Sequence, residues 1–169
     1  FLSHNNHIDL IPTSRSDASY KNHIVHDLSK ELPLGCDGFP HHIDAIIHTA
    51  AIIDEKTESF DIIKNNLLYS FNVAKYAKNT KARTFINLSS IAVYGSPLKD
   101  AMYDESTSCN PISNYGISKF LSEKLFEAYL PERLRLINIR LGYVLSQNMH
   151  ESYVTSKFYN ALKNNKDVL

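Results

Sequence analysis

The chain has 169 residues, with 18 basic and 18 acidic side chains and a formal net charge of zero. This length is enough for one domain with a hydrophobic core, and the charge balance does not favour a nucleic acid or an anionic membrane as a partner. No apolar run approaches the roughly 20 residues that span a bilayer, and the polar N-terminus does not resemble a secretory signal. Cys36 and Cys109 are not spaced as metal ligands, so reduced thiols in a cytoplasmic protein are the simplest interpretation.

Five short apolar segments are expected to form strands. They lack a strict alternation of apolar and polar residues, which indicates a parallel sheet covered on both faces. The third segment is rich in isoleucine and too short to be assigned to a helix. The expected strands are 7–13, 23–28, 43–51, 84–90 and 134–141.

Two long helices, 60–79 and 111–129, are predicted between the later strands. Asn110 can cap the second helix, Pro111 suits its first turn, and the helix should stop before Pro131. The alternation of strands and helices predicts an α/β fold with a doubly wound parallel sheet. The apolar residues at helical spacing, which should face the sheet, are Ile63, Leu67, Leu68, Phe71 and Ala74 in the first helix, and Ile117, Phe120, Leu121, Leu125 and Ala128 in the second.

Tyr115 precedes Lys119 by four residues near the start of the second predicted helix. Residues at this spacing share a helix face, but the spacing alone leaves a catalytic pair and an ordinary helix pair equally open. Two further pairs in a polar C-terminal segment are more simply interpreted as surface residues. These are Tyr153 with Lys157, and Tyr159 with Lys163.

The strand 84–90 ends in two hydroxyl side chains, Ser89 and Ser90. In an open α/β sheet, ligands bind outside the carboxyl ends of the strands. The helix that carries Tyr115 follows this strand and returns its N-terminal end to the same edge, so we expect Tyr115 and Lys119 to approach Ser90. The alternative is that the two serines only satisfy the backbone of a turn.

These three residue types suit the removal of hydrogen from a carbinol. A phenol has an unperturbed pKa of about 10 and is a poor base near neutrality, but a nearby ammonium lowers that pKa. The tyrosinate can then accept the hydroxyl proton, or the phenol can donate it in the reverse direction. A serine hydroxyl can hold the substrate oxygen by a hydrogen bond.

The segments NLSSIAVYGS (87–96) and PISNYGISK (111–119) resemble the extended short-chain dehydrogenase/reductases, specifically the NAD-dependent epimerase/dehydratase family. The resemblance covers nearly the whole chain and implies a Rossmann-type sheet. By position, Tyr115 would be the acid/base, Lys119 would lower its pKa and bind the nicotinamide ribose, and Ser90 would contact the reacting oxygen. Ser90 is preferred to Ser89 because it lies four residues before Tyr94. No metal site is expected.

The resemblance also implies the positions that bind the cofactor. Residues at the carboxyl ends of the second and third expected strands would border the adenine and line the dinucleotide, and those at and after the end of the last strand would lie near the nicotinamide. The alternatives are that His48 is a satisfied core histidine and that Asn66 and Asn72 only bond neighbouring loops. Tyr69 replaces the glycine usual in this helix. The expected cofactor-binding residues are Arg15, Asp27, Leu28, His48, Ala50, Ala51, Asn66, Leu88, Ser89, Tyr115, Lys119, Leu141, Gly142 and Val144.

The segment after the first expected strand bears on the choice of cofactor. Thr13, Ser14 and Arg15 could accommodate a 2′-phosphate, since arginine suits phosphate geometry. This favours NADP modestly over NAD. Asp17 could instead bind a ribose 2′-hydroxyl, and a solvated Arg15 is the plain alternative.

The glycine-rich phosphate turn of the family is not found in the sequence. We therefore expect an excerpt of a longer protein, in which the first strand and most of the C-terminal substrate domain are absent. Residues 1–145 would form a partial NAD(P)-binding Rossmann domain, and 146–169 would begin a substrate-binding region. In the strand order 3-2-1-4-5-6, the missing strand would lie in the middle of the sheet.

The resemblance implies an epimerase- or dehydratase-type oxidoreductase that acts on a nucleotide sugar. An NADPH-dependent ketone or aldehyde reductase and a non-catalytic dinucleotide-binding regulator remain as alternatives. A homodimer that forms a four-helix bundle from the two long helices is also implied.

Overall fold

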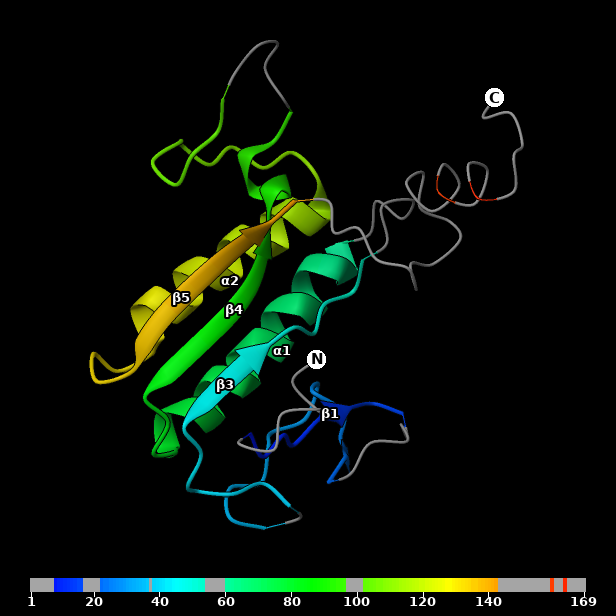
Figure 1. Ribbon diagram of the computed structural model, residues 1–169. Coiled ribbons are helices and arrows are strands. Elements are labelled where there is room, and N and C mark those ends of the chain that lie inside the picture. The colour runs from blue at the N-terminus through cyan, green and yellow to red at the C-terminus, as the bar shows by residue number, and fades with distance from the viewer. Residues whose placement is uncertain are drawn as a thin grey trace.

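The computed structural model describes residues 8–16, 22–36, 38–53, 60–96 and 102–142, together with Tyr159 and Lys163 (Figure 1). Strands and helices alternate from β3 onward, as expected for an α/β fold. The elements are β1 (Thr13–Ser14), β2 (Ile24–Val25), β3 (Ala45–His48), α1 (Phe60–Asn79), β4 (Thr84–Ser90), the 3₁₀ turn η2 (Ile91–Tyr94), α2 (Asn114–Tyr129) and β5 (Arg135–Leu141).

The strands form two parallel sheets, β1-β2 and β3-β4-β5. Both helices lie side by side against one face of the larger sheet (Figure 1). Within the described residues, no strand joins β1 to β3. This break falls between the two strands that the expected order places on either side of the family's first strand.

Most predicted elements are present, and two of them, β4 and α1, have the predicted bounds. The strand prediction for 7–13 was wrong over residues 8–12, because a strand needs a hydrogen-bonded neighbour. Thr13 and Ser14 alone pair with Ile24 and Val25 in the described part of the chain.

The start of α2 differs from the prediction. The helix begins at Asn114 rather than Pro111, and Ser113 is its N-cap, accepting a hydrogen bond of 3.0 Å from the backbone N–H of Gly116. A serine oxygen at this position satisfies a backbone donor that has no partner within the helix. The helix ends at Tyr129, as predicted.

The predicted apolar faces of the two helices were right only in part: Ala74 belongs to the core cluster and Leu125 packs against it. Phe71 is 38% exposed and Leu121 37% exposed, although Ala74 is buried. The buried positions instead include polar side chains, of which Asn66 donates to Ser118 and Ser70 to Ser122 between the two helices. These bonds offset the cost of burying the four polar groups. The buried residues are Ile62, Asn66, Ser70, Asn72, Val73, Ala74, Tyr76 and Ala77 in α1, and Gly116, Ser118, Lys119, Ser122, Glu123 and Phe126 in α2.

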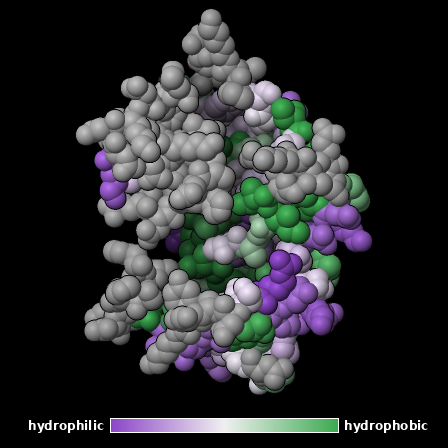
Figure 2. All heavy atoms as spheres, turned by 90° about the vertical axis from the view of Figure 1, so that its right-hand side faces the viewer, coloured by the Kyte–Doolittle hydropathy of each residue, from purple (hydrophilic) through white to green (hydrophobic). Residues whose placement is uncertain are grey.

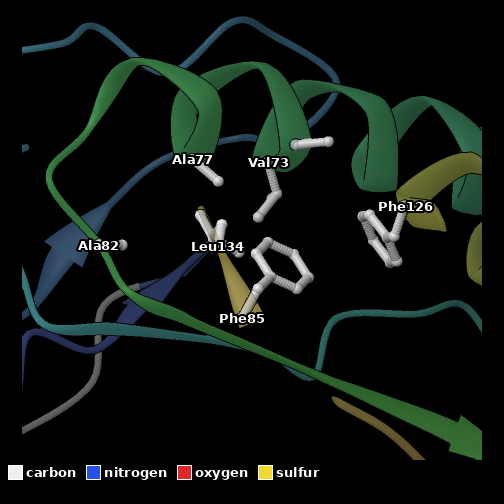
Figure 3. Packing of buried hydrophobic residues seen from close by; sticks show 7 residues of the cluster. Val73, Ala77, Ala82, Phe85, Phe126 and Leu134 are labelled. Atoms are coloured by element: carbon white, nitrogen blue, oxygen red, sulfur yellow. The ribbon is translucent and has the colours of Figure 1, made fainter. Parts of the chain in front are cut away.

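The hydrophobic core lies towards the amino ends of β4 and β5 (Figure 3). The rings of Phe85 in β4 and Phe126 in α2 have centroids 4.7 Å apart. Val73, Ala74 and Ala77 of α1 join Ala82, Phe85, Phe126 and Leu134 in this cluster. At the carboxyl ends of the strands, polar contacts to α2 accompany the buried side chain of Val93 in η2.

The opposite face of the larger sheet is not covered by α1 or α2. Side chains alternate along a strand, so Ile47 and Ile139 point away from the helices, and they are 43% and 38% exposed. Figure 2 shows apolar side chains gathered at the centre of one face of the molecule. Among the described residues, helices thus cover only one face of the larger sheet.

None of the helices in the described part of the chain is long and apolar enough to cross a membrane.

Candidate active site

Ser89 and Ser90, at the end of β4, point to opposite sides of the sheet and make different contacts. Ser89 is buried on the helix side and donates a 2.5 Å hydrogen bond to Oε1 of Glu123. Ser90 points to the other side, caps η2 and accepts a 3.2 Å hydrogen bond from the backbone N–H of Ala92. The hydroxyl of Ser89 is already hydrogen-bonded inside the protein, which supports Ser90 as the serine that faces a ligand.

The first turn of α2 lies directly against η2. A Cβ added to Gly116 would lie 2.5 Å from the carbonyl oxygen of Ala92, so only glycine permits this approach of two backbones. Gly116 follows Tyr115, and Ala92 comes two residues after Ser90. The structure therefore brings Tyr115 and the turn capped by Ser90 to the same edge of the sheet, as the sequence predicts.

Lys119 lies one helical turn after Tyr115 and is only 3% exposed. Burial lowers the pKa of Lys119 to about 8, although the carboxylate of Glu123 opposes this change. Burial of an ammonium is costly, and this sets Lys119 apart from Lys124, which is exposed on the same helix.

Glu123, which is fully buried, and Arg140, whose side chain is 21% exposed, form an ion pair that the sequence analysis missed. Arg140 donates from Nη2 to Oε2 of Glu123 at 2.9 Å and from Nε to Oε1 at 3.2 Å. Its Nη1 donates to the hydroxyl of Tyr94 at 3.0 Å, and the hydrogen bonds to Glu123 raise the pKa of the guanidinium. The sequence did contain one signal for Glu123, because it follows Lys119 by four residues, just as Lys119 follows Tyr115.

The residues expected near the nicotinamide converge on the same edge. Leu141 is the register partner of Ser90 across β4 and β5. A Cβ on Gly142 would lie 3.9 Å from the side chain of Ile91. Leu88 is half-buried on β4, and Val144 lies outside the described residues.

His48 and Asn66 have partners inside the protein. His48 is 3% exposed, its Nε2 lies 3.2 Å from Oγ of Ser70, and burial, aided by the charge of Lys119, lowers the pKa of His48 to about 3. Asn66 accepts from the backbone N–H of Ile52 at 2.7 Å and donates to its carbonyl at 3.1 Å. These contacts favour the internal alternatives that the sequence left open. The two side chains position the segment after β3, which contains Ala50 and Ala51.

Arg15, Asp27 and Leu28 lie in the segments that follow the two strands of the smaller sheet. Arg15 is exposed after β1, and Asp27 accepts a 2.9 Å hydrogen bond from the backbone N–H of Ser29, which lowers the pKa of Asp27. Asn72 of α1 donates to the carbonyl oxygen of Leu28 at 2.8 Å. This bond ties the segment after β2 to α1.

The C-terminal tyrosine–lysine pairs differ from the pair in α2. Tyr159 and Lys163 are exposed, which agrees with their interpretation as surface residues. Tyr153 and Lys157 lie outside the described residues.

Comparison with known proteins decides the family. The sequence model of the NAD dependent epimerase/dehydratase family matches residues 18–169. The chain belongs to this family. It is 30% identical over 138 residues to a dTDP-D-glucose 4,6-dehydratase of Dictyostelium discoideum, with 73% of the chain and 32% of that protein covered. It is 32% identical over 108 residues to a D-erythronate dehydrogenase of Haemophilus influenzae, with 62% of the chain and 34% of that protein covered.

Solved structures confirm the Rossmann-type fold. The UDP-N-acetylglucosamine 4-epimerase from Bacillus cereus matches with a TM-score of 0.74 at 19% identity, over 92% of this chain and 54% of that one. Other similar structures contain NAD, some with a UDP-sugar, and another contains NADPH. The chain spans about a third of the length of the curated relatives it matches.

Proposed function

We propose that the chain forms part of an enzyme that oxidises or reduces a carbinol of a nucleotide sugar with the help of NAD or NADP. The observation that carries this proposal is the contact between Gly116 and Ala92, which sets Tyr115 beside the turn capped by Ser90. Lys119 lies one turn deeper in the same helix. Family membership and the named dehydratase relative support a nucleotide-sugar substrate.

Each of the three side chains has a distinct proposed role. Tyr115 removes the proton of the substrate hydroxyl, or returns it in the reverse direction, and Ser90 holds the substrate oxygen by a hydrogen bond. The ammonium of Lys119 favours the phenolate and so lowers the pKa of Tyr115. With a pKa of about 8, Lys119 remains mostly protonated at neutral pH.

The cofactor would supply a nicotinamide ring that takes and gives back a hydride. Lys119 would bind the ribose hydroxyls, and Leu141 and Gly142 would lie near the nicotinamide. Ala50 and Ala51 would line the dinucleotide, in a segment held by the bonds between Asn66 and Ile52. Asp27 and Leu28 would border the adenine, and Arg15 would meet a 2′-phosphate if the cofactor is NADP.

Turnover of a panel of UDP- and dTDP-sugars by the full-length protein tests this function. We expect conversion of at least one sugar with no net change in nicotinamide absorbance, as in an epimerase or dehydratase. Net consumption of the reduced cofactor would favour the reductase alternative, and dinucleotide binding without any turnover would favour the regulator. If Arg15 holds a 2′-phosphate, NADP will bind more tightly than NAD, and Arg15→Gln will remove that difference.

We also propose a homodimer through the outer faces of α1 and α2. Phe60 is 73% exposed, and Phe71 and Leu121 keep more than a third of their surface in water. The rings of Phe71 and Tyr129 lie 5.4 Å apart, so the apolar surface continues from one helix to the other. A second copy placed there would complete a four-helix bundle.

Analytical ultracentrifugation of the full-length protein checks this assembly. The wild type should sediment as a dimer, and the pair Phe71→Glu and Leu121→Glu should produce a monomer, because the charges cannot be buried unpaired. Lys81→Glu, at an exposed position outside both helices, is the control and should leave the dimer intact. A monomeric wild type would contradict the proposal.

A further inference from the structure

We propose that Glu123 and Arg140 are positioning residues, whose ion pair anchors the catalytic end of α2 and the turn capped by Ser90 to the carboxyl end of the sheet. The positional part of this inference concerns the fold alone. Its catalytic consequence rests on the function proposed above.

The position of Glu123 on α2 is the first support. Tyr115, Lys119 and Glu123 follow one another at intervals of four residues, so they lie along one side of the helix. Glu123 is fully buried, and its carboxylate accepts hydrogen bonds from Ser89 in β4 and Arg140 in β5. Two neighbouring strands thus hold the same side of the helix that carries Tyr115.

The second support is the further reach of Arg140. Its Nη1 donates to the hydroxyl of Tyr94 in η2 at 3.0 Å, and its guanidinium lies 5.0 Å from the centre of that ring. The Tyr94 hydroxyl in turn donates to the backbone carbonyl of Asp104 at 2.8 Å. One guanidinium therefore joins α2, β5 and the turn that begins at Ser90, and through Tyr94 it reaches the loop that precedes α2.

Apolar packing alone does not fix the orientation of α2 at this end of the sheet, where Val93 of η2 is fully buried. The core cluster around Phe85 and Phe126 lies towards the amino ends of the strands, and apolar contacts are not directional. A bidentate pair between arginine and a carboxylate is directional and restricts both partners to one geometry. A buried ion pair is weak evidence for stability, because desolvation offsets its attraction, so its main effect here is orientation.

A paired substitution in the full-length protein separates anchoring from stability. Removing one partner leaves a buried charge unpaired, whereas replacing both with apolar residues of similar volume is often tolerated. We therefore expect Glu123→Met combined with Arg140→Met to fold and to bind NAD or NADP as the wild type does. Its kcat should fall by about tenfold or more with KM unchanged, since a small displacement of a catalytic group is enough to slow a reaction.

Amide hydrogen exchange without cofactor gives a second readout that does not depend on activity. In the double variant, residues 90–96 and 114–119 should exchange about tenfold faster, because their local opening no longer breaks the ion pair. The matched control is Lys124→Met with Glu127→Met, which removes an exposed ion pair of 2.7 Å on the same helix. The control should exchange and turn over like the wild type.

The outcomes are distinguishable. Wild-type exchange in residues 90–96 of the double variant, or a wild-type kcat, would overturn the inference. If the double variant does not fold, Tyr94→Phe provides the test, since it removes the link to η2 but keeps the ion pair. This variant should speed exchange in residues 91–96, and unchanged exchange there would also overturn the inference.

The proposed function can fail independently of the anchoring. A wild-type protein that binds neither NAD nor NADP would refute the proposed function, while the exchange comparison would still decide whether the ion pair anchors α2.

Discussion

Replacement of Tyr115 by Phe in the full-length protein should lower kcat by about 10²-fold or more and leave cofactor affinity unchanged. The substitution removes one oxygen atom and keeps the ring that packs in the first turn of α2. Without the phenol, the substrate hydroxyl has no positioned group to take its proton. The neighbouring Gly116 and its contact with Ala92 remain, so the turn capped by Ser90 should keep its place.

Steady-state kinetics and titration of the dinucleotide measure the two effects separately. Tyr159→Phe is the matched control, because Tyr159 is an exposed tyrosine that also precedes a lysine by four residues. It should retain full activity. Unchanged turnover in the Tyr115 variant would exclude this residue as the acid/base.

Replacement of Lys119 by Met should have two opposite effects: a loss of turnover and a gain in stability. Turnover should fall by about 10²-fold, because the charge that favours the phenolate is lost. Glu123 should tolerate the change, since its carboxylate stays paired with Arg140. The gain in stability follows from the cost of burying the ammonium, which also lowers its pKa.

The pH dependence gives the sign of the stability effect. Burial lowers the pKa of Lys119 from 10.5 to about 8, so between these values the unfolded chain binds a proton that the folded chain does not. The free energy of unfolding therefore rises with pH across this window. Below about pH 8 the folded protein carries the full cost, about 3 kcal/mol for such a shift. The methionine variant has no such cost and should be more stable than the wild type at neutral pH by about 1–3 kcal/mol.

Denaturant unfolding of the cofactor-free protein at several pH values measures this difference. The advantage of Lys119→Met should shrink as the pH rises from about 8 to about 10.5. Lys124→Met, at an exposed position on the same helix, should show no comparable gain. A Lys119 variant that is less stable than the wild type across the whole range would show that the ammonium is not an unfavourable buried charge.

The elements with strong local signals could be predicted from the sequence. The segment 84–90 is a short apolar run, and 60–79 has apolar residues at helical spacing; both became elements with the predicted bounds. Ser90, Tyr115 and Lys119 could be placed at one edge because the direction of a parallel sheet follows from the order of its strands and helices. The bounds of these elements depend on residues that are close in the chain, and the shared edge depends on a topology that has few alternatives.

The buried faces of the helices and the anchoring pair required the tertiary structure. Apolar periodicity favoured Phe71 and Leu121 as core residues, whereas Asn66 and Ser70 are buried instead. Asn66 bonds to Ser118 and Ser70 to Ser122, each partner 52 residues away in the chain. A hydropathy pattern describes one helix at a time, so it cannot show that a polar side chain will meet its partner on another element and be buried at little cost. For the same reason, the ion pair of Glu123 and Arg140 became visible only when α2 and β5 were brought together.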